Sequence, residues 1–132
     1  MPKYILDTDT CIYWLNGDRQ VEKRVVASGL ANVFITVITE CELFYGAYKS
    51  SRVDKNLQVM RMLREKVKTI HTTKDIAPLY GRIKAELERA GQVLDDADLL
   101  IASVVLANKG ILVSNNTGHF RRISGLQIEN WR

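Results

Sequence analysis

The segment Lys3-Tyr-Ile-Leu-Asp7-Thr8-Asp9-Thr10 contains a short apolar run that ends on an acid. Short apolar runs bounded by polar residues are typical of buried strands. A second run, Val33-Phe-Ile-Thr-Val37, is rich in β-branched and aromatic residues and also predicts a strand. Later segments have the same character at residues 67–71, 111–114 and, more briefly, 126–128. The sequence therefore predicts a sheet of four to five strands.

Helical patterns separate the later of these strands. Apolar residues at helical spacing predict helices over residues 56–66, 76–90 and 99–109. Gly91 and Gly110 follow the last two segments and predict their ends. Strands that alternate with helices of this length form right-handed crossovers. We therefore expect an α/β fold in one domain over residues 1–132, with a mainly parallel central sheet and helices on both faces.

The composition agrees with one globular domain. Of 132 residues, 46% are hydrophobic and 26% are charged, which suits a single core. No apolar run approaches the ~20 residues of a membrane span, and the first acid comes too soon for a secretion signal. We therefore expect a cytoplasmic protein with no membrane partner. The 2 Cys and 2 His residues are too scattered for a structural zinc site.

The net charge of +4 is unevenly distributed. Between Lys49 and Lys68, seven basic residues stand against two acidic ones. A basic stretch of this kind attracts phosphates. It is equally typical of a solvated helix surface. The charge pattern alone leaves both interpretations open.

Polar groups follow three of the predicted strands, where an open α/β sheet binds its ligands. Asp7 directly follows the first strand. The expected caps of the next helix are the two residues after it, Thr8 or Asp9. Glu42 follows the second strand, although Thr39-x-x-Glu42 also matches a capping box. Asn116 lies in the polar cluster after the fourth strand, which turn chemistry alone would explain.

Asp98 begins the most apolar helix and shares a helix face with Ile101, Ala102 and Val105. A carboxylate on a core face is costly unless a cation or several donors meet it. Carboxylates that share one crevice repel each other, and a hard cation such as Mg²⁺ or Mn²⁺ relieves that repulsion. The sequence therefore predicts a site for a divalent cation that includes Asp98.

These motifs resemble the PIN-domain ribonucleases and, more narrowly, the VapC toxins of bacterial type II toxin-antitoxin systems. The resemblance extends over almost the whole chain. Single motifs have little specificity, but their order and spacing together are specific. They are Ile5-Leu6-Asp7-Thr8, Cys11-Ile12-Tyr13, Glu42-Leu43-Phe44-Tyr45-Gly46-Ala47, Arg82 to Gly91, Asp98-Leu99-Leu100-Ile101-Ala102, Val113-Ser114-Asn115-Asn116-Thr117 and Glu129-Asn130-Trp131.

The resemblance implies a metal-dependent endoribonuclease that cleaves structured RNA, with transfer RNA as the expected substrate. The metal ligands of the family correspond to Asp7, Glu42 and Asp98, and the expected cofactor is Mg²⁺ or Mn²⁺. The fourth catalytic position, often aspartate, is Asn116 here, and His119 stands where many relatives carry an acid. The resemblance also implies a homodimer and a VapB-type antitoxin that covers the acidic crevice.

Two other functions remain open on the sequence. Asp7 and Asp9 are similar to the paired acids of haloacid-dehalogenase-like phosphatases, in which the first aspartate attacks phosphorus. That function leaves Glu42 without a role. The second alternative is a PIN-like module that binds a partner without catalysis, for which Asn116 and His119 are the only support.

Overall fold

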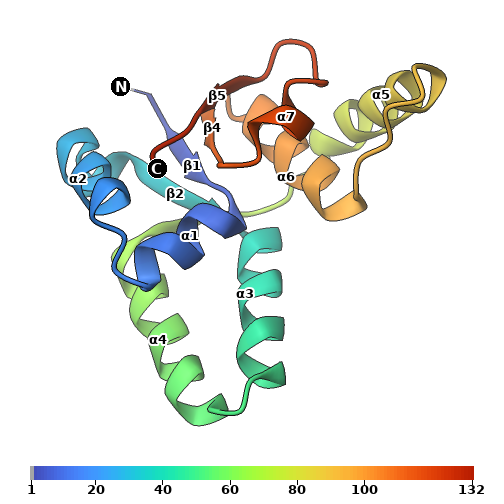
Figure 1. The fold of residues 1–132 in the computed structure, drawn as a ribbon. Helices are drawn as coiled ribbons and strands as arrows, with labels where there is room; N and C mark the ends of the chain where they lie inside the picture. The colour runs from blue at the N-terminus through green and yellow to red at the C-terminus, as the bar shows by residue number, and fades with distance from the viewer. Residues whose placement is uncertain (1) are drawn as a thin grey trace.

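The computed structural model describes residues 2–132 and contains a five-stranded sheet with the order β3-β2-β1-β4-β5 (Figure 1). Every neighbouring pair of strands is parallel. The predicted α/β fold is therefore confirmed, including the short fifth strand. The strands are β1 (Tyr4–Leu6), β2 (Val33–Thr36), β3 (Lys68–Ile70), β4 (Ile111–Val113) and β5 (Gln127–Glu129).

The strand order creates a switch point at β1. The chain first adds β2 and β3 on one side of β1 and then returns to add β4 and β5 on the other. At such a point the connections leave the carboxyl ends of neighbouring strands in opposite directions and open a crevice. The crevice therefore lies beyond the carboxyl ends of β1, β2 and β4, where Asp7, Glu42 and Asn116 follow in sequence.

Seven α-helices connect the strands within residues 2–132. The predicted helices at 56–66, 76–90 and 99–109 are present, but the first and third begin three residues earlier than expected. The early starts, Val53 to Lys55 in α4 and Asp96 to Asp98 in α6, each contain only one apolar residue, which is too few to show helical periodicity. The helices are α1 (Thr8–Leu15), α2 (Arg19–Ser28), α3 (Val37–Lys49), α4 (Val53–Lys66), α5 (Ile76–Arg89), α6 (Asp96–Ala107) and α7 (Thr117–Phe120).

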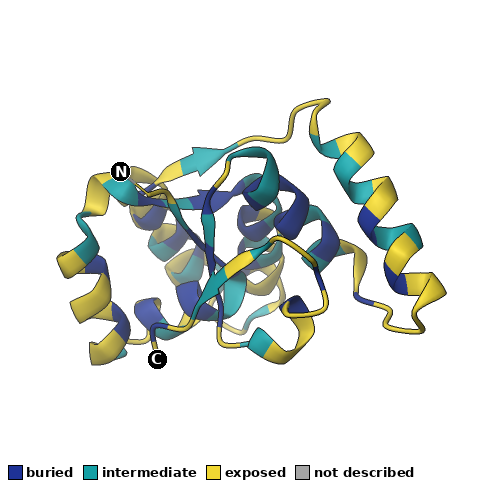
Figure 2. Cartoon of the chain, turned by 90° about the horizontal axis from the view of Figure 1, so that it is seen from above, coloured by how far each residue is buried: buried dark blue, intermediate teal, exposed yellow. Residues whose placement is uncertain are grey.

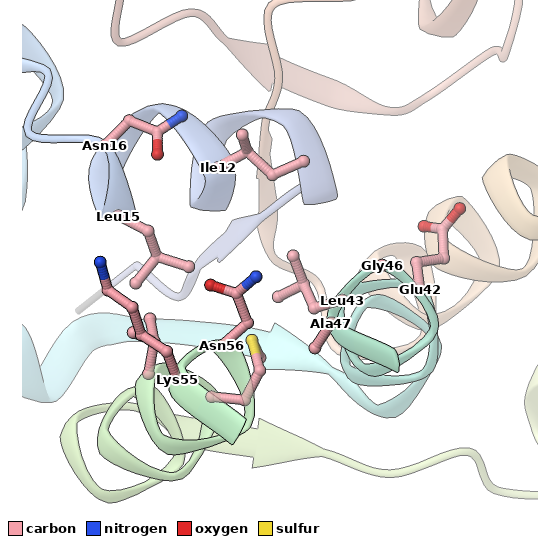
Figure 3. A pocket seen from close by; sticks show the side chains of 11 residues that line it. Ile12, Leu15, Asn16, Glu42, Leu43, Gly46, Ala47, Lys55 and Asn56 are labelled. Atoms are coloured by element: carbon pink, nitrogen blue, oxygen red, sulfur yellow. The ribbon is translucent and has the colours of Figure 1, made fainter. Parts of the chain in front are cut away.

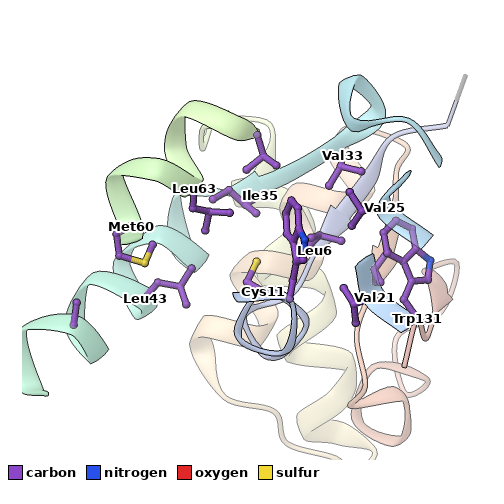
Figure 4. Close-up of a cluster of buried hydrophobic side chains, with 14 of the residues drawn as sticks. Leu6, Cys11, Val21, Val25, Val33, Ile35, Leu43, Met60, Leu63 and Trp131 are labelled. Atoms are coloured by element: carbon purple, nitrogen blue, oxygen red, sulfur yellow. The ribbon is translucent and has the colours of Figure 1, made fainter. Parts of the chain in front are cut away.

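The helices cover both faces of the sheet, as expected. On one face, α1 to α4 pack over alternate strand residues that include Leu6 and Ile35 (Figure 4). On the other, α5, α6 and α7 pack over Ile5 and Leu112. Side chains alternate between the faces of a strand, so neighbouring residues of β1 enter different cores. The central strands β1, β2 and β4 are thus mostly buried, whereas the edge strands β3 and β5 are partly exposed. Other exposed residues lie on the outer surfaces of the helices and in loops (Figure 2).

The two predicted helix-ending glycines act differently. Gly91 follows the end of α5 with φ +69°, a conformation that suits glycine. Gly110 does not have a positive φ; Lys109 takes the left-handed conformation instead, with φ 52°. A Cβ at Gly110 would lie 2.8 Å from Cδ1 of Ile5. Gly110 is therefore required because β1 passes close to it, which the helix pattern did not reveal.

The described residues contain no helix long and apolar enough to cross a membrane. Both cysteines are free, and their environments differ: Cys11 is buried and Cys41 is exposed on α3. The apolar stretches of sequence around both cysteines predict buried hydrophobic residues, which is confirmed for Cys11 and wrong for Cys41. Its apolar neighbours in sequence belong to other faces of the helix.

Candidate active site

Asp7 is buried at the end of β1 and is the N-cap of α1. Its Oδ1 accepts a hydrogen bond from the backbone N–H of Thr8 at 2.9 Å, and its Oδ2 accepts one from Oγ of Ser114 at 2.8 Å. The expectation that Thr8 or Asp9 caps this helix is wrong, because α1 begins directly after the strand. Asp7 therefore has both a structural role and a position in the crevice.

Ser114 was not among the predicted site residues. It is fully buried after β4, where its Oγ donates to Asp7 and accepts from the backbone N–H of Asn116 at 3.0 Å. Asn116 itself is half-buried, and its Nδ2 lies 2.8 Å from Nδ1 of His119. A polar residue directly after an apolar strand was the available signal for Ser114. Its contact with Asp7 depends on β1 and β4 being neighbours.

Glu42 does not form the predicted capping box. Helix α3 begins at Val37, and its N-cap is Thr36, whose Oγ1 accepts from the backbone N–H of Thr39 at 3.1 Å. Glu42 therefore lies in the second turn, too far along to reach the N-terminus. Its Oε1 accepts instead from Oγ1 of Thr8, which also lies 3.2 Å from Oγ1 of Thr39. Thr8 thus connects Glu42 to the Asp7 corner of the crevice.

Asp98 lies in the first turn of α6 and is half-buried. Its neighbours on the same helix face, Ile101, Ala102 and Val105, are all fully buried, as predicted. Burial is the first cause that raises the pKa of Asp98, followed by the negative charges of Asp95 and Glu42. The crevice therefore brings Asp98 and Glu42 into one electrostatic environment, although their helices are distant in sequence.

The electrostatics of Asp7 agree with this arrangement. Burial, with the charges of Asp9 and Asp98, raises the pKa of Asp7 to about 7, against the hydrogen bonds from Ser114 and Thr8. No lysine or arginine is among the groups that shift the pKa of Asp7 or Asp98. The crevice is therefore a cluster of interacting carboxylates, and among the described residues no lysine or arginine forms an ion pair with Asp7, Glu42 or Asp98.

The donor chemistry of this cluster fits a hard divalent cation. Carboxylate and amide oxygens are the ligands that Mg²⁺ and Mn²⁺ prefer. Within residues 2–132, no three acidic, histidine or cysteine side chains already converge as a complete set of ligands. Instead, Glu42 accepts from the hydroxyl group of Thr8, and Asp7 accepts from the hydroxyl group of Ser114. Side-chain adjustment would therefore accompany metal binding.

Neighbouring acids have other roles. Asp9 accepts from the backbone N–H of Asn115 at 3.1 Å and from Oγ1 of Thr10 at 3.1 Å. Asp95 occupies the N-cap position of α6 without a side-chain capping bond. Asp96 points elsewhere, as expected, and pairs with Nζ of Lys84 at 2.9 Å. The predicted residues Asp7, Glu42, Asp98 and Asn116 therefore share the crevice with Asp9 and Asp95, whose charges raise the pKa of Asp98. Their role as metal ligands stays a prediction.

An apolar groove of about 520 Å³ lies beside the crevice, between α1, α3 and α4 (Figure 3). Ile12, Leu15 and Leu43 are among the side chains that line it, and Glu42 lies at its margin. Ile12 and Leu15 are 44% and 38% exposed. Apolar side chains exposed along a groove commonly mark a binding surface. The groove and the carboxylate cluster therefore share Glu42 as a common border.

Comparisons with known proteins agree with this geometry. The family model of the PIN domain matches residues 4–126. Ribonuclease VapC2 of Rickettsia felis is 32% identical over 130 residues, 97% of each chain. The tRNA(fMet)-specific endonuclease VapC of Salmonella typhimurium is 32% identical over 131 residues, 99% of each chain.

Solved structures show the same relationship at the level of the fold. The chain superimposes on DNA-bound VapBC from Salmonella typhimurium with a TM-score of 0.94 and 32% identity, over 100% of both chains. Promoter-bound VapBC2 from Rickettsia felis gives a TM-score of 0.90 and 31% identity, over 98% of both chains. The sheet order, the carboxylate crevice and these full-length matches lead to one conclusion: the chain belongs to the PIN-domain family and, within it, to the VapC ribonucleases.

Proposed function

We propose that this protein is the endoribonuclease toxin of a type II toxin-antitoxin system and that it requires Mg²⁺ or Mn²⁺. The observation that carries the proposal is the crevice, where Asp7, Glu42 and Asp98 come together without a lysine or arginine to balance them. Burying several carboxylates is unfavourable unless a cation meets them. The loss of stability from burying these carboxylates is expected if they bind a catalytic cation.

Each side chain has a distinct task in this proposal. Asp7, Glu42 and Asp98 hold the ion, directly or through water. When bound, the ion lowers the pKa of water and offsets the charge that develops on the phosphate. Thr8 orients Glu42, and Ser114 orients Asp7. Asn116 completes the oxygen ligands or holds the attacking water.

The proposed substrate is structured RNA, with transfer RNA as the first candidate. A relative of nearly equal length is named a tRNA(fMet)-specific endonuclease. The exposed basic residues between Lys49 and Lys68 lie on and around α4 and supply positive charge for phosphates away from the scissile bond. Arg64 is less available to phosphates than the other basic residues, because it forms an ion pair with the buried Glu40. Because transfer RNA is a cytoplasmic molecule, the proposed location of the protein is the cytoplasm.

The proposed partner is a VapB-type antitoxin. Two solved relatives that superimpose over the full chain are VapBC complexes. The groove between α1, α3 and α4 offers an apolar surface that ends at Glu42. An antitoxin segment in this groove would cover the crevice at the same time and block access to RNA. The homodimer stays a prediction, which light scattering of the purified toxin would check.

The central experiment combines metal binding and RNA cleavage. Calorimetry should detect Mn²⁺ binding to the wild type and a strong loss in Asp98→Asn. Transcribed tRNA(fMet) should be cut when Mn²⁺ is present, and EDTA should stop the reaction. A wild-type protein that binds Mn²⁺ but cuts none of a panel of RNAs would contradict the nuclease function. Absence of Mn²⁺ binding would instead favour the non-catalytic module.

The phosphatase alternative loses its support. Its second catalytic acid would be Asp9, but both carboxylate oxygens of Asp9 accept hydrogen bonds, from Thr10 and from the backbone of Asn115. Asp95 and Asp96 could imitate a second pair of acids that this phosphatase family carries late in its sequence, but Asp96 pairs with Lys84. The full-length similarity to VapC proteins further disfavours it.

A further inference from the structure

The polar groups after β4 form a chain of hydrogen bonds from Asp7 to an imidazole. Oγ of Ser114 donates to Asp7 at 2.8 Å, and the backbone N–H of Asn116 donates to Ser114 at 3.0 Å. The Asn116 side chain then reaches Nδ1 of His119 at 2.8 Å. Ser114 is buried, Asn116 is half-buried and His119 is exposed. The chain therefore fixes an exposed ring relative to a buried carboxylate.

The contact with Asn116 also fixes which ring nitrogen carries the proton. The amide nitrogen Nδ2 of Asn116 can only donate, so Nδ1 of His119 is the acceptor. A neutral ring with an unprotonated Nδ1 carries its hydrogen on Nε2. No acceptor for Nε2 is found within the described part of the chain, residues 2–132. His119 therefore offers an oriented N–H donor to solvent.

This donor lies at the rim of the carboxylate cluster. His119 is close enough to Asp98 to lower its pKa, whereas the neighbouring acids raise it. An RNA phosphate that approaches the crevice without a metal ion meets repulsion from Asp7, Glu42 and Asp98. An N–H donor at the rim opposes that repulsion and gives the phosphate a defined contact.

We propose that Nε2–H of His119 binds a non-bridging phosphate oxygen of the RNA, and that Asn116 is the positioning residue that orients the ring. This inference rests on the proposed endoribonuclease function and adds a substrate contact to the same site. It also explains why Asn116 and His119 occur together. An aspartate at position 116 would accept from Nδ1–H instead, and the neutral ring would then carry no hydrogen on Nε2.

The test measures binding of fluorescent tRNA(fMet) in EDTA, with intact RNA verified on a gel. His119→Ala should weaken binding on the order of tenfold, because a hydrogen bond to a charged group is lost at an exposed site. His119→Gln restores an N–H donor and should recover most of the loss. His71→Ala is the matched control, because His71 is the other histidine and is also exposed. It should stay within about twofold of the wild type.

A double-mutant cycle tests the positioning role. Asn116→Ala alone should weaken RNA binding by about threefold, since the ring becomes free to rotate. In the His119→Ala background the same change should add nothing, because no ring remains to orient. Additive losses would mean that Asn116 touches RNA directly and would overturn the positioning role. Mn²⁺ affinity of His119→Ala should equal that of the wild type, which separates a phosphate contact from metal binding.

The outcomes separate this inference from the proposed function. If the wild type cuts tRNA with Mn²⁺ while His119→Ala binds RNA as tightly as the wild type, the inference fails and the function stands. Equal losses of RNA affinity in His119→Ala and His71→Ala would indicate a contribution that any exposed histidine makes. This result would also overturn the inference. If the wild type neither cuts nor binds RNA, both proposals fail. Binding that depends on His119 without any cleavage would contradict the nuclease alone.

Discussion

Asp7 and Asp98 lie in the same crevice but are held in different ways. Asp7 is buried at a strand end and accepts hydrogen bonds from Thr8 and Ser114. Asp98 is half-buried on α6, and no hydrogen bond contributes to its raised pKa. The Asp7 corner is therefore ordered by folding itself, whereas the Asp98 corner keeps its carboxylate free for a ligand. A site built in this way combines a fixed reference point with an adjustable one.

Removing the fixed corner should have the largest effect. Asp7→Ala should lower RNA cleavage by about 10³-fold or more, because metal-supplied stabilisation of several kcal/mol is lost. Relief of carboxylate repulsion favours the folded state, but loss of the N-cap costs about 1 kcal/mol and Ser114 loses its acceptor. The melting temperature should therefore change by only a few degrees. Circular dichroism measures the melting temperature, and a cleavage assay measures the activity of the same variant. Wild-type activity in a folded Asp7→Ala variant would exclude Asp7 as a metal ligand.

Glu42 connects the two corners, and its charge can be removed without its hydrogen bond. Glu42→Gln keeps an Oε1 that accepts from Thr8, but it lacks the negative charge that a divalent cation needs. Cleavage should fall about 100-fold, with little change in melting temperature. Because Glu42 has no capping role in α3, unimpaired cleavage would leave this side chain without a function in the site.

A substitution of Thr8 tests how much its hydrogen bond to Glu42 contributes to activity. Thr8→Val removes the hydroxyl that donates to Glu42 and keeps the shape of the side chain. The expected loss of activity is about tenfold, since Glu42 remains but is less well oriented. Thr8→Ser is the control, because it retains the hydroxyl and should stay near wild-type activity. A serine variant as impaired as the valine variant would show that packing, not the hydrogen bond, matters here.

The same two corners show what the sequence could and could not reveal. The sequence correctly predicted that Asp98 shares a helix face with buried apolar residues, because the periodicity of a single helix determines that face. The position of Asp7 was also predicted, but its capping role was missed, since it depends on α1 starting directly after β1. Ser114 was overlooked for a related reason. Its role arises only where β4 lies beside β1, and a contact across 107 residues leaves no local pattern.

The raised pKa of Asp7 predicts a pH dependence of stability. With a pKa of about 7 in the folded state and 3.8 as the ordinary value, the folded protein binds more protons between these values. The free energy of unfolding in EDTA should therefore fall as pH rises from about 4 to about 7 and level off above. Asp98 acts in the same direction.

Melting curves at pH 5 and pH 8 check this dependence against Asp7→Asn, which cannot titrate at this position. The wild type should lose on the order of 2 kcal/mol more than the variant, or several degrees. Mn²⁺ should reverse the trend, with a larger gain in melting temperature at pH 8, because protons compete with the ion at pH 5. Equal pH profiles for the two proteins would mean that Asp7 is ionised throughout this range.

The smallest expected effect concerns Asn116, at the position where the resemblance to the family leads us to expect an aspartate in many members. Asn116→Asp adds a charge near Asp7 and Asp98, so the metal-free protein should be less stable through like-charge repulsion. His119 limits the loss, because it lies next to the new carboxylate. We expect about 1 kcal/mol, a shift of a few degrees in melting temperature.

With Mn²⁺ the same substitution should act in the opposite direction. A carboxylate is a better ligand than an amide for a hard cation, so the metal-induced gain in melting temperature should be larger for Asn116→Asp than for the wild type. Both proteins are compared with and without Mn²⁺, in the absence of RNA, so that the phosphate contact of His119 does not contribute. A gain equal to or smaller than that of the wild type would mean that residue 116 does not face the ion. The adjustable side of the site would then have to include Asp95, the negative charge that raises the pKa of Asp98 most.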